Sequence, residues 1–315
     1  MDGITGKKVL VTGGSGFLGR HVVKQLIDRG DCEVIAPSHF SYDLSNKLNV
    51  RYMLEDLYPD TVIHLAAVCG GIGANQVEPG RFFYENMQMG LNLIEESRKA
   101  GIEKFVQVGT VCSYPKFCPT PFKEESIWDG YPEETNAPYG IAKKALLTMA
   151  QAYRQQYGFN AIYLIPVNLY GPGDNFDPSS SHVIPALIKK CVEAREAGKN
   201  EVEVWGSGTA TREFLYVEDA AKGIVKATEF YDKPEPINLG NGYSMPITNV
   251  AAAIGMATRF YGAFKLVGGL DGQPKRELDT TRAKQEFGWE ADTSFGTGIK
   301  NTVEWYENSN IHKLV

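Results

Sequence analysis

Residues 8–19 read Lys-Val-Leu-Val-Thr-Gly-Gly-Ser-Gly-Phe-Leu-Gly, and this stretch decides the fold. Its first five residues form a mostly apolar run that predicts a strand, and a helix is expected from about Phe17 to Arg29. Gly13, Gly16 and Gly19 stand at the junction. Glycines there allow a tight turn, a close approach of the backbone to a pyrophosphate, and close packing of helix on strand. The stretch therefore predicts a dinucleotide-binding unit with the phosphates at the helix N-terminus.

Strand-like and helix-like segments alternate through the first half of the chain. The strands are continuous apolar runs, which is typical of a parallel sheet covered by helices on both faces. Strands are expected at 9–12, 33–36, 61–66, 104–108 and 161–165, and helices at 17–29, 47–57, 81–100 and 139–157. Repeated strand–helix order predicts an α/β fold with a doubly wound parallel sheet of the Rossmann type.

The second half shows a looser pattern after Pro166. Residues 170–181 are rich in Gly, Pro, Asn, Asp and Ser and predict a loop, followed by a helix near 184–197 and an edge strand at 201–205. No flexible linker is found, so we expect a smaller C-terminal α/β substrate-binding domain folded onto the first. The predicted division is 1–168 for dinucleotide binding, with 214–240 returning to it, and 169–315 mainly for substrate binding.

Composition excludes several classes of protein. The net charge is −6 and no Lys/Arg block occurs, so neither nucleic acid nor an anionic membrane is an expected partner. Five scattered cysteines without a C-x-x-C pair argue against a structural metal site or a disulfide framework. The first strand leaves no room for a signal peptide, and no apolar run approaches the length of a membrane span. We expect a cytoplasmic enzyme without a metal.

The end of the second strand bears on the choice of dinucleotide. NAD-binding proteins commonly place a carboxylate there for the ribose 2′-hydroxyl. The stretch Ala36-Pro-Ser-His-Phe40 has none. Ser38 and His39 are candidates to contact a 2′-phosphate, and Asp43 is better placed for the adenine. We therefore predict NADP, used as NADPH.

Two groups for hydride chemistry follow further along the chain. Tyr139 and Lys143 are four residues apart and share a helix face. The lysine can lower the tyrosine pKa and bind the cofactor ribose, while the phenol exchanges a proton with a sugar oxygen. Thr110 can supply an assisting hydroxyl.

Cys112 lies two residues after Thr110. In its thiolate form it can take a proton from carbon, which would add epimerisation to a redox reaction. Most free cysteines are buried packing residues, and from this residue alone both interpretations stay open.

The combination resembles the extended short-chain dehydrogenase/reductases. Within that family it is similar, over nearly the whole chain, to the enzymes that epimerise and reduce GDP-4-keto-6-deoxymannose. The stretches that carry the resemblance are 70–75 (Gly-Gly-Ile-Gly-Ala-Asn), 112–115 (Cys-Ser-Tyr-Pro), 168–172 (Asn-Leu-Tyr-Gly-Pro), 174–176 (Asp-Asn-Phe), 181–187 (Ser-His-Val-Ile-Pro-Ala-Leu), and 204–208 (Val-Trp-Gly-Ser-Gly) with 212–214 (Arg-Glu-Phe).

The resemblance implies NADPH-dependent 3,5-epimerisation and 4-reduction of GDP-4-keto-6-deoxy-D-mannose to GDP-L-fucose, by a homodimer that pairs through the helices near 81–100 and 139–157. Its catalytic residues correspond to Thr110, Cys112, Tyr139, Lys143 and His182. Its GDP-sugar contacts correspond to Asn168, Lys190, Trp205, Arg212 and Asp271. Its cofactor contacts correspond to Gly13, Ser15, Gly16, Phe17, Leu18, Gly19, Ser38, His39, Asp43, Leu65, Ala66, Ala67, Val108, Tyr139, Lys143, Pro166, Asn168, Leu169 and His182.

Three departures from the family pattern leave the substrate more open than the reaction class. Thr110 replaces the usual serine, Lys190 stands where some members have arginine, and Cys69 falls in a stretch where a lysine is sometimes found. One alternative is an epimerase without net reduction, of the GDP-mannose 3,5-epimerase or UDP-sugar 4-epimerase type. Another is a catalytically silent binding protein on the same fold.

Single residues also have structural interpretations. His182 can cap the helix that follows it, Trp205 can be a packing residue, and Arg212 can pair with Glu213.

Overall fold

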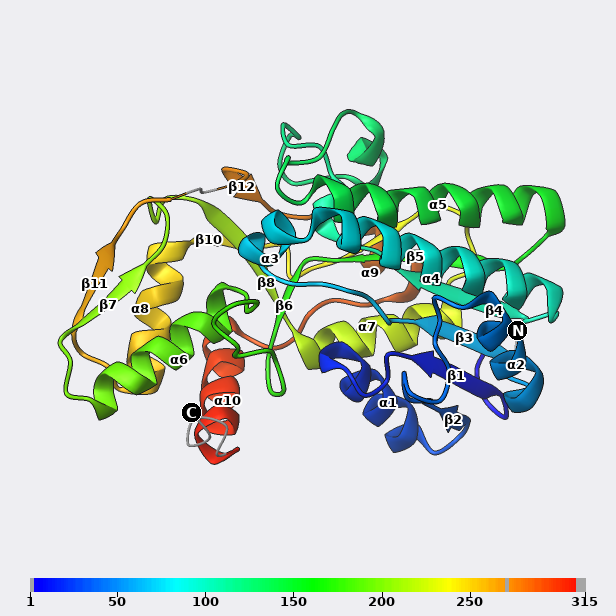
Figure 1. The fold of residues 1–315 in the computed structure, drawn as a ribbon, viewed down its shortest axis with the longest axis horizontal. Helices are drawn as coiled ribbons and strands as arrows, with labels where there is room; N and C mark the ends of the chain where they lie inside the picture. The colour runs from blue at the N-terminus through cyan, green and yellow to red at the C-terminus, as the bar shows by residue number, and fades with distance from the viewer. Residues whose placement is uncertain (1–2, 270–271, 310–315) are drawn as a thin grey trace.

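The main sheet of the protein has six parallel strands in the order β2-β1-β3-β4-β5-β9. The computed structural model describes residues 3–269 and 272–309 (Figure 1). The strands are β1 (Lys8–Thr12), β2 (Glu33–Ile35), β3 (Thr61–His64), β4 (Lys104–Val108), β5 (Ala161–Pro166) and β9 (Ile237–Leu239). Every residue of β3, β4 and β5 is buried, as their continuous apolar runs predict. The predicted doubly wound fold is confirmed.

Helices cover the two faces of this sheet. Helices α2 (Lys47–Leu57), α4 (Pro79–Lys99) and α5 (Ala137–Tyr157) pack side by side, and α1 (Phe17–Arg29) packs against α7 (Val217–Phe230). Figure 1 shows α4 and α5 on one side of the strands and α1 and α7 on the other. Among the helices of residues 3–269 and 272–309, none is long and apolar enough to cross a bilayer.

The C-terminal part has its own core. Strands β10 (Ser244–Pro246), β8 (Thr211–Tyr216) and β12 (Lys275–Arg276) form one small sheet, in which β6 (Asn168–Tyr170) also pairs with β8. Strand β7 (Glu201–Val204) pairs with β11 (Ala263–Leu266). Helices α6, α8 and α10 contribute a separate cluster of buried apolar side chains. The remaining elements are α3 (Ile72–Val77), the 3-10 turns η1 (Val111–Ser113) and η2 (Glu124–Trp128), α6 (Val183–Glu196), α8 (Ile247–Thr258), α9 (Thr281–Phe287) and α10 (Phe295–Asn308).

The chain returns twice from this part to the main sheet. Helix α7 packs on α1 and β9 joins β5, within the stretch that was expected to return. A second return brings Leu278, Phe287 and Trp289 into the core of the main sheet. The sequence did not predict this return. The boundary at residue 168 stays a prediction.

The turn between β1 and α1 depends on glycine at two positions. Gly13 has φ +71°, and a Cβ there would lie 2.7 Å from the backbone nitrogen of Ala66. A Cβ on Gly19 would lie 1.9 Å from the carbonyl oxygen of Gly13. The amide of Gly16 donates to that same carbonyl at 2.9 Å. Helix α1 is therefore packed directly on the turn that precedes it.

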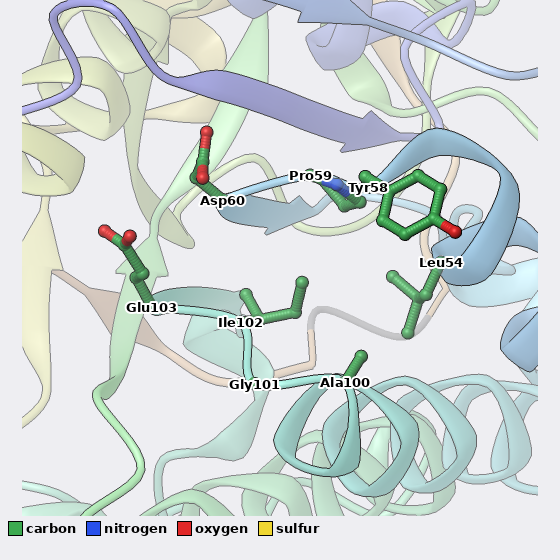
Figure 2. Close-up of a pocket in the computed structure, with 8 residues that line it drawn as sticks. All are labelled: Leu54, Tyr58, Pro59, Asp60, Ala100, Gly101, Ile102 and Glu103. Carbon is green, nitrogen blue, oxygen red and sulfur yellow. The ribbon is translucent and has the colours of Figure 1, made fainter.

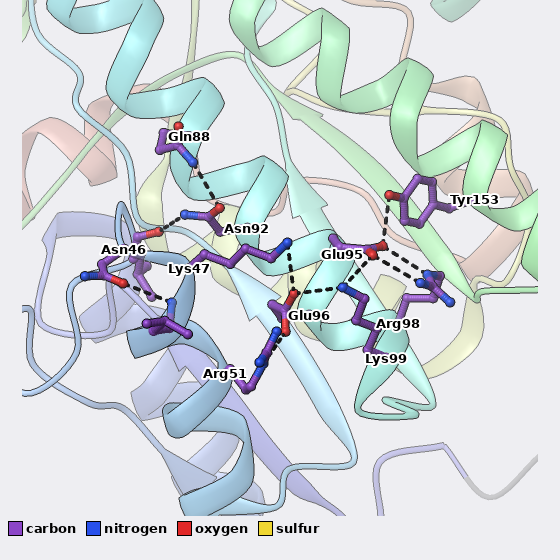
Figure 3. A network of polar contacts seen from close by, with 12 residues as sticks. Asn46, Lys47, Arg51, Gln88, Asn92, Glu95, Glu96, Arg98, Lys99 and Tyr153 are labelled. Atoms are coloured by element: carbon purple, nitrogen blue, oxygen red, sulfur yellow. Dashed lines mark hydrogen bonds and ion pairs between the residues drawn. The ribbon is translucent and has the colours of Figure 1, made fainter.

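A buried carboxylate ties α2 to α4. Glu96 is 3% exposed and accepts a hydrogen bond from Arg51 Nε on α2 at 2.9 Å. It also forms ion pairs with Lys99 Nζ at 3.2 Å and with Lys47 Nζ at 3.6 Å (Figure 3). Burial opposes ionisation of Glu96, but the hydrogen bonds and charges of Arg51 and Lys99 prevail and lower its pKa.

Gly19→Ala is expected to lower both stability and dinucleotide affinity, because its Cβ would collide with backbone that has no room to move. Overpacking of this kind costs about 1–3 kcal/mol. Thermal unfolding and a titration with NADPH check this. Gly80→Ala on α4 is the control, since a Cβ there meets nothing within 4 Å. Normal cofactor affinity in Gly19→Ala would contradict the packing argument.

Glu96→Gln is expected to destabilise the protein by about 1 kcal/mol at neutral pH, a modest figure because the paired cations are partly exposed. The folded-state pKa of Glu96 is lowered, so its contribution is present above the unfolded-state pKa and is lost as pH falls through the folded-state pKa. Urea unfolding of both proteins at pH 7 and pH 3 checks this. If Glu96→Gln were destabilised equally at both pH values, the cause would be lost packing and not the lost charge. The exposed pair Lys300–Glu304 offers a control in Glu304→Gln, which should change little.

Candidate active site

The predicted site residues gather at the carboxyl ends of the parallel strands. The glycine turn follows β1, residues Leu65–Ala67 follow β3, Thr110 follows β4, and Asn168 follows β5. Because parallel strands end at the same edge of the sheet, these segments meet there. Leu65 donates its amide to the carbonyl of Thr12 at 3.2 Å, which fixes the segment after β3 against the glycine turn.

The start of α1 fits the phosphates of a dinucleotide. The N-cap residue is Gly16, which offers no side-chain acceptor, and the first turn contains no acidic residue. Arg20 lies over the turn, with Nη2 donating to the carbonyl of Ser15 and Nε to that of Gly16, both at 3.3 Å. The helix end is thus left open to an anion, with a cation beside it. Arg20 was not predicted, although it directly follows the last glycine.

The turn after β2 carries hydroxyl groups and an imidazole. The hydroxyls of Ser38 and Ser41 lie 2.9 Å apart. Asp43 is directed to its own turn, where Oδ1 accepts from the amide and hydroxyl of Ser45 at 2.9 and 2.8 Å, and these bonds lower its pKa. No carboxylate lies between Ala36 and Phe40, so a 2′-phosphate there would meet hydrogen-bond donors and no acidic side chain.

His64, at the end of β3, was not predicted. It is fully buried, and Nδ1 is 2.8 Å from the hydroxyl of Thr12. Its Nε2 has no hydrogen-bond partner among the described residues. Burial, with a smaller effect of the charge on Lys143, lowers its pKa well below the usual range. His64 is therefore a neutral structural residue that joins β1 to β3.

Tyr139 and Lys143 lie on α5 as predicted. Lys143 is buried and donates from Nζ to the carbonyl of Val108 at 3.2 Å, while Tyr163 donates from its hydroxyl to the carbonyl of Lys143 at 2.8 Å. Burial lowers the pKa of Lys143 to about 8. This arrangement holds the ammonium group at the end of β4.

The pKa of Tyr139 differs from the expectation. Lys143 was expected to lower it, but desolvation, followed by the thiols of Cys69 and Cys112, raises it well above the usual range, and the hydroxyl of Thr110 opposes this only weakly. Lys143 donates to the carbonyl of Val108 and is not among the largest influences on the pKa of the phenol. Tyr139 is therefore a proton donor near neutral pH.

Cys112 lies in the turn η1 that directly follows Thr110. The hydroxyl of Thr110 accepts from the amide of Cys112 at 3.2 Å, and Ser113 donates from its hydroxyl to the carbonyl of Gly140 on α5 at 3.0 Å. A Cβ on Gly140 would lie 2.3 Å from the carbonyl oxygen of Cys112, so the turn packs tightly on α5. Cys112 itself is half-buried.

Arg276 on β12 was not predicted and lies at this thiol. Its Nη1 is 3.6 Å from Cys112 Sγ, in hydrogen-bonding geometry. Its Nε donates to Gln273 Oε1 at 3.0 Å, and Gln273 Nε2 donates to the carbonyls of Pro115 and Lys116, both at 2.9 Å. Arg276 and Gln273 are both buried. The sequence offered no signal for Arg276, because it is 164 positions from Cys112.

His182 is the N-cap residue of α6, but its side chain makes no capping hydrogen bond. It is exposed, yet has enough protein around it that desolvation, followed by the charge of Arg276, lowers its pKa. The amide of Gly71 donates to the carbonyl of Ser180 at 3.0 Å, and Asn75 Nδ2 donates to the carbonyls of Gly70 and Gly71 at 2.9 and 3.0 Å. The motif at 70–75 therefore supports the loop that carries His182.

Lys190 and Trp205 form one surface in the C-terminal part. Lys190 Nζ lies 5.3 Å from the centre of the Trp205 ring, and the ring is 73% exposed, so it is available for stacking and is not a core residue. Arg212 donates from Nη1 to the carbonyl of Thr211 at 2.8 Å. Asp271 lies outside the described residues.

The structural alternative for Arg212, an ion pair with Glu213, is not found, because the carboxylate of Glu213 accepts backbone amides. Glu213 Oε1 accepts the amides of Asn241 and Gly242 at 2.6 and 2.8 Å, and Oε2 accepts the amide of Leu278 at 2.6 Å. Asn168 Nδ2 donates to the carbonyl of Glu213 at 2.9 Å.

Figure 2 shows a hollow at the opposite ends of the strands of the main sheet. Leu54, Tyr58, Asp60, Ile102 and Glu103 are among the residues that line it. Asp60 and Glu103 directly precede β3 and β4, so the hollow lies at the amino ends of the strands. None of the predicted site residues lines it. Open α/β sheets bind ligands at the carboxyl ends, and the candidate site is therefore the edge that holds Tyr139, Lys143, Cys112 and Arg276.

Comparison with known proteins agrees with this geometry. Residues 9–240 match the model of the NAD dependent epimerase/dehydratase family. A GDP-L-fucose synthase of Sinorhizobium fredii is 39% identical, with 96% of each chain covered. The solved GDP-L-fucose synthetase of Naegleria fowleri bound to NADP is 29% identical, with a TM-score of 0.85 over 97% of this chain and 95% of that one.

A GDP-6-OMe-4-keto-L-xylo-heptose reductase from C. jejuni is also similar in structure, with 27% identity and a TM-score of 0.90 over 97% of this chain and 99% of that one. The matched region of this chain includes the glycine turn, the Cys112 turn and the Tyr139–Lys143 pair. The chain belongs to the NAD dependent epimerase/dehydratase family.

Proposed function

We propose that the protein is an NADPH-dependent enzyme that epimerises GDP-4-keto-6-deoxy-D-mannose at C3 and C5 and reduces it at C4, giving GDP-L-fucose. The observation that carries this proposal is that Cys112 contacts Arg276 in a turn that packs on α5 next to Tyr139, while the charge of the same arginine lowers the pKa of His182. A simple reductase needs the Tyr139–Lys143 pair alone, whereas inversion of carbon needs further proton-transfer groups. The near-complete similarity to GDP-L-fucose synthases supports the choice of substrate.

The epimerisation follows from the ketone at C4, which acidifies the hydrogens on C3 and C5 because the resulting enolate is stabilised. Cys112 as a thiolate removes a proton from carbon, and His182 returns one to the opposite face. Desolvation and Arg276 lower the pKa of His182, so its acid form is populated at lower pH than that of a free imidazole. A bound diphosphate sugar adds negative charge, which favours the acid form again.

The reduction uses the other pair of residues. When bound, NADPH supplies the hydride that reduces C4. Tyr139 is protonated near neutral pH and gives its proton to the C4 oxygen. Lys143, held at the end of β4 by Val108, is placed to bind the cofactor ribose. Support for NADP comes from the hydroxyl-rich turn after β2 and from the NADP-bound relative of Naegleria fowleri.

The GDP part of the substrate is assigned to the C-terminal part of the chain. Trp205 offers an exposed ring for the guanine, and Lys190, 5.3 Å from its centre, offers a positive charge near the diphosphate. Arg212 lies on β8, the same sheet as Arg276 on β12. A substrate that reaches from Trp205 to Cys112 would thus cross this sheet.

The proposal extends to a homodimer that pairs through α4 and α5. The two helices pack against each other on one face of the sheet (Figure 1), and α4 leaves Phe83, Tyr84 and Leu91 between 38% and 62% exposed. A cytoplasmic location stays a prediction.

Incubation with GDP-4-keto-6-deoxymannose, NADPH and deuterated water tests the reaction. We expect oxidation of NADPH together with deuterium at C3 and C5 of the product. Cys112→Ser should abolish most label uptake while leaving the affinity for NADPH unchanged, and Tyr139→Phe should keep the exchange and lose the reduction.

The same experiment separates the alternatives. Label without consumption of NADPH would indicate an epimerase without net reduction. Consumption of NADPH without label would indicate a simple 4-ketoreductase. A protein that binds both ligands and does neither would refute the proposal.

Ser38→Asp is expected to shift the cofactor preference from NADPH toward NADH. A carboxylate at this turn would repel a 2′-phosphate and accept from a 2′-hydroxyl. We expect the ratio of the two dissociation constants to change at least about tenfold, which corresponds to about 1.4 kcal/mol. Fluorescence titrations of both cofactors measure it. An equal loss of affinity for both would mean that Ser38 does not lie near the 2′ position.

A further inference from the structure

We propose that Arg276 is a positioning residue for the proton-transfer site, whose guanidinium holds the sulfur of Cys112 and makes it ready to act as a base. This assignment rests on the proposed function for its role in turnover, but its physical content concerns the ligand-free protein. Nothing in the family resemblance placed a residue at this point.

The hydrogen bond between Arg276 and Cys112 runs from the guanidinium to the sulfur. A guanidinium group can only donate, so the sulfur, 3.6 Å from Nη1, is the acceptor. A thiolate accepts far better than a neutral thiol, and a fixed cation favours the thiolate. Arg276 is 7% exposed, so water screens this interaction only weakly.

A second set of bonds fixes the guanidinium in place. Gln273, 3% exposed, accepts from Arg276 Nε and donates to the carbonyls of Pro115 and Lys116. Those carbonyls belong to the segment that leaves the Cys112 turn. The arginine and the thiol are thus held by the same short stretch of chain, which keeps their distance constant.

The other charged groups around Arg276 are consistent with this role. Glu133 is 6% exposed, and although burial opposes it, hydrogen bonds from Thr135 and Asn136 and the charge of Arg276 lower its pKa. Glu133 is therefore an anion whose pKa reflects the charge of the buried guanidinium. From α5, Tyr139 faces Cys112 as a neutral phenol.

His182 receives the opposite effect from the same cation. After desolvation, Arg276 is the contribution that lowers its pKa. Arg276 thus offers Cys112 a cation as hydrogen-bond donor while its charge opposes a positive charge on His182. In many thiol enzymes an imidazolium supplies that stabilisation; here the guanidinium does, and the imidazole remains able to take up or give a proton.

The experiment uses the full-length protein without substrate. Alkylation by iodoacetamide is followed at each cysteine by mass spectrometry from pH 5 to pH 10, and the His182 ring signal is titrated by NMR. We expect Arg276→Met to slow alkylation of Cys112 about tenfold at pH 7 and to move its pH midpoint up by about one unit. The midpoint of His182 should also move upward. Arg276→Lys, which keeps the charge, should restore part of both effects.

Two internal controls accompany these variants. Cys69 should alkylate with an unchanged midpoint in every variant, and Arg282→Gln should leave Cys112 unaffected, because Arg282 pairs with Glu125. Unchanged midpoints in a folded Arg276→Met would overturn the proposal. If Arg276→Met does not fold, the alkylation midpoints of Cys112 and Cys69 in the wild-type protein test the proposal instead. Burial raises the pKa of Cys69, and a Cys112 midpoint no lower than that of Cys69 would refute the role of Arg276.

Failure of this inference is distinguishable from failure of the proposed reaction. The alkylation and NMR readouts need no sugar, so they stand even where GDP-4-keto-6-deoxymannose is not converted. Conversely, a wild type that incorporates deuterium normally, together with an Arg276→Met variant that does so equally well at every pH, would keep the reaction and remove Arg276 from it.

Discussion

Parallel hydrogen bonding among the six strands of the main sheet is the constraint on which the site depends. Because all six run in one direction, the turns after β1, β3, β4 and β5 end at one edge. A single antiparallel strand in the middle would move one of these turns to the other edge. The buried contact between Thr12 and His64, the last residues of β1 and β3, shows how closely two of these ends are joined.

The C-terminal part is linked to this edge by a buried carboxylate. Glu213 accepts three backbone amides, two from the segment after β9 and one from the segment after β12. A Cβ on Gly240 would lie 2.2 Å from its Oε1, so only glycine fits there. Since the segment after β12 also follows Arg276, the same carboxylate helps to place the guanidinium at Cys112. The contact between Arg276 and Cys112 thus depends on residues far along the chain from the cysteine.

Much of this arrangement was predictable from the sequence, for identifiable reasons. Apolar runs and glycine spacing are local signals, and they located five of the six strands of the main sheet, all but β9, together with the long helices between them and the turn at Gly13. The Tyr139–Lys143 spacing is also local. Arg276 could not be found in this way, because its proximity to Cys112 results from tertiary folding and its neighbours in sequence carry no motif. The same holds for His64 and for the second return of the chain, where Leu278 and Trp289 give no sign of which core they join.

The second return also bears on how such chains can be recombined. Leu278, Phe287 and Trp289 complete the core beneath the main sheet, although they follow most of the substrate-binding part. A chimera made with a single crossover at residue 168 would therefore replace part of the core of the main sheet along with the proposed sugar-binding surface. A new sugar specificity would have to be grafted as separate insertions between the returning segments. In this chain the unit that can be exchanged is the loop or the small sheet, and not the C-terminal half.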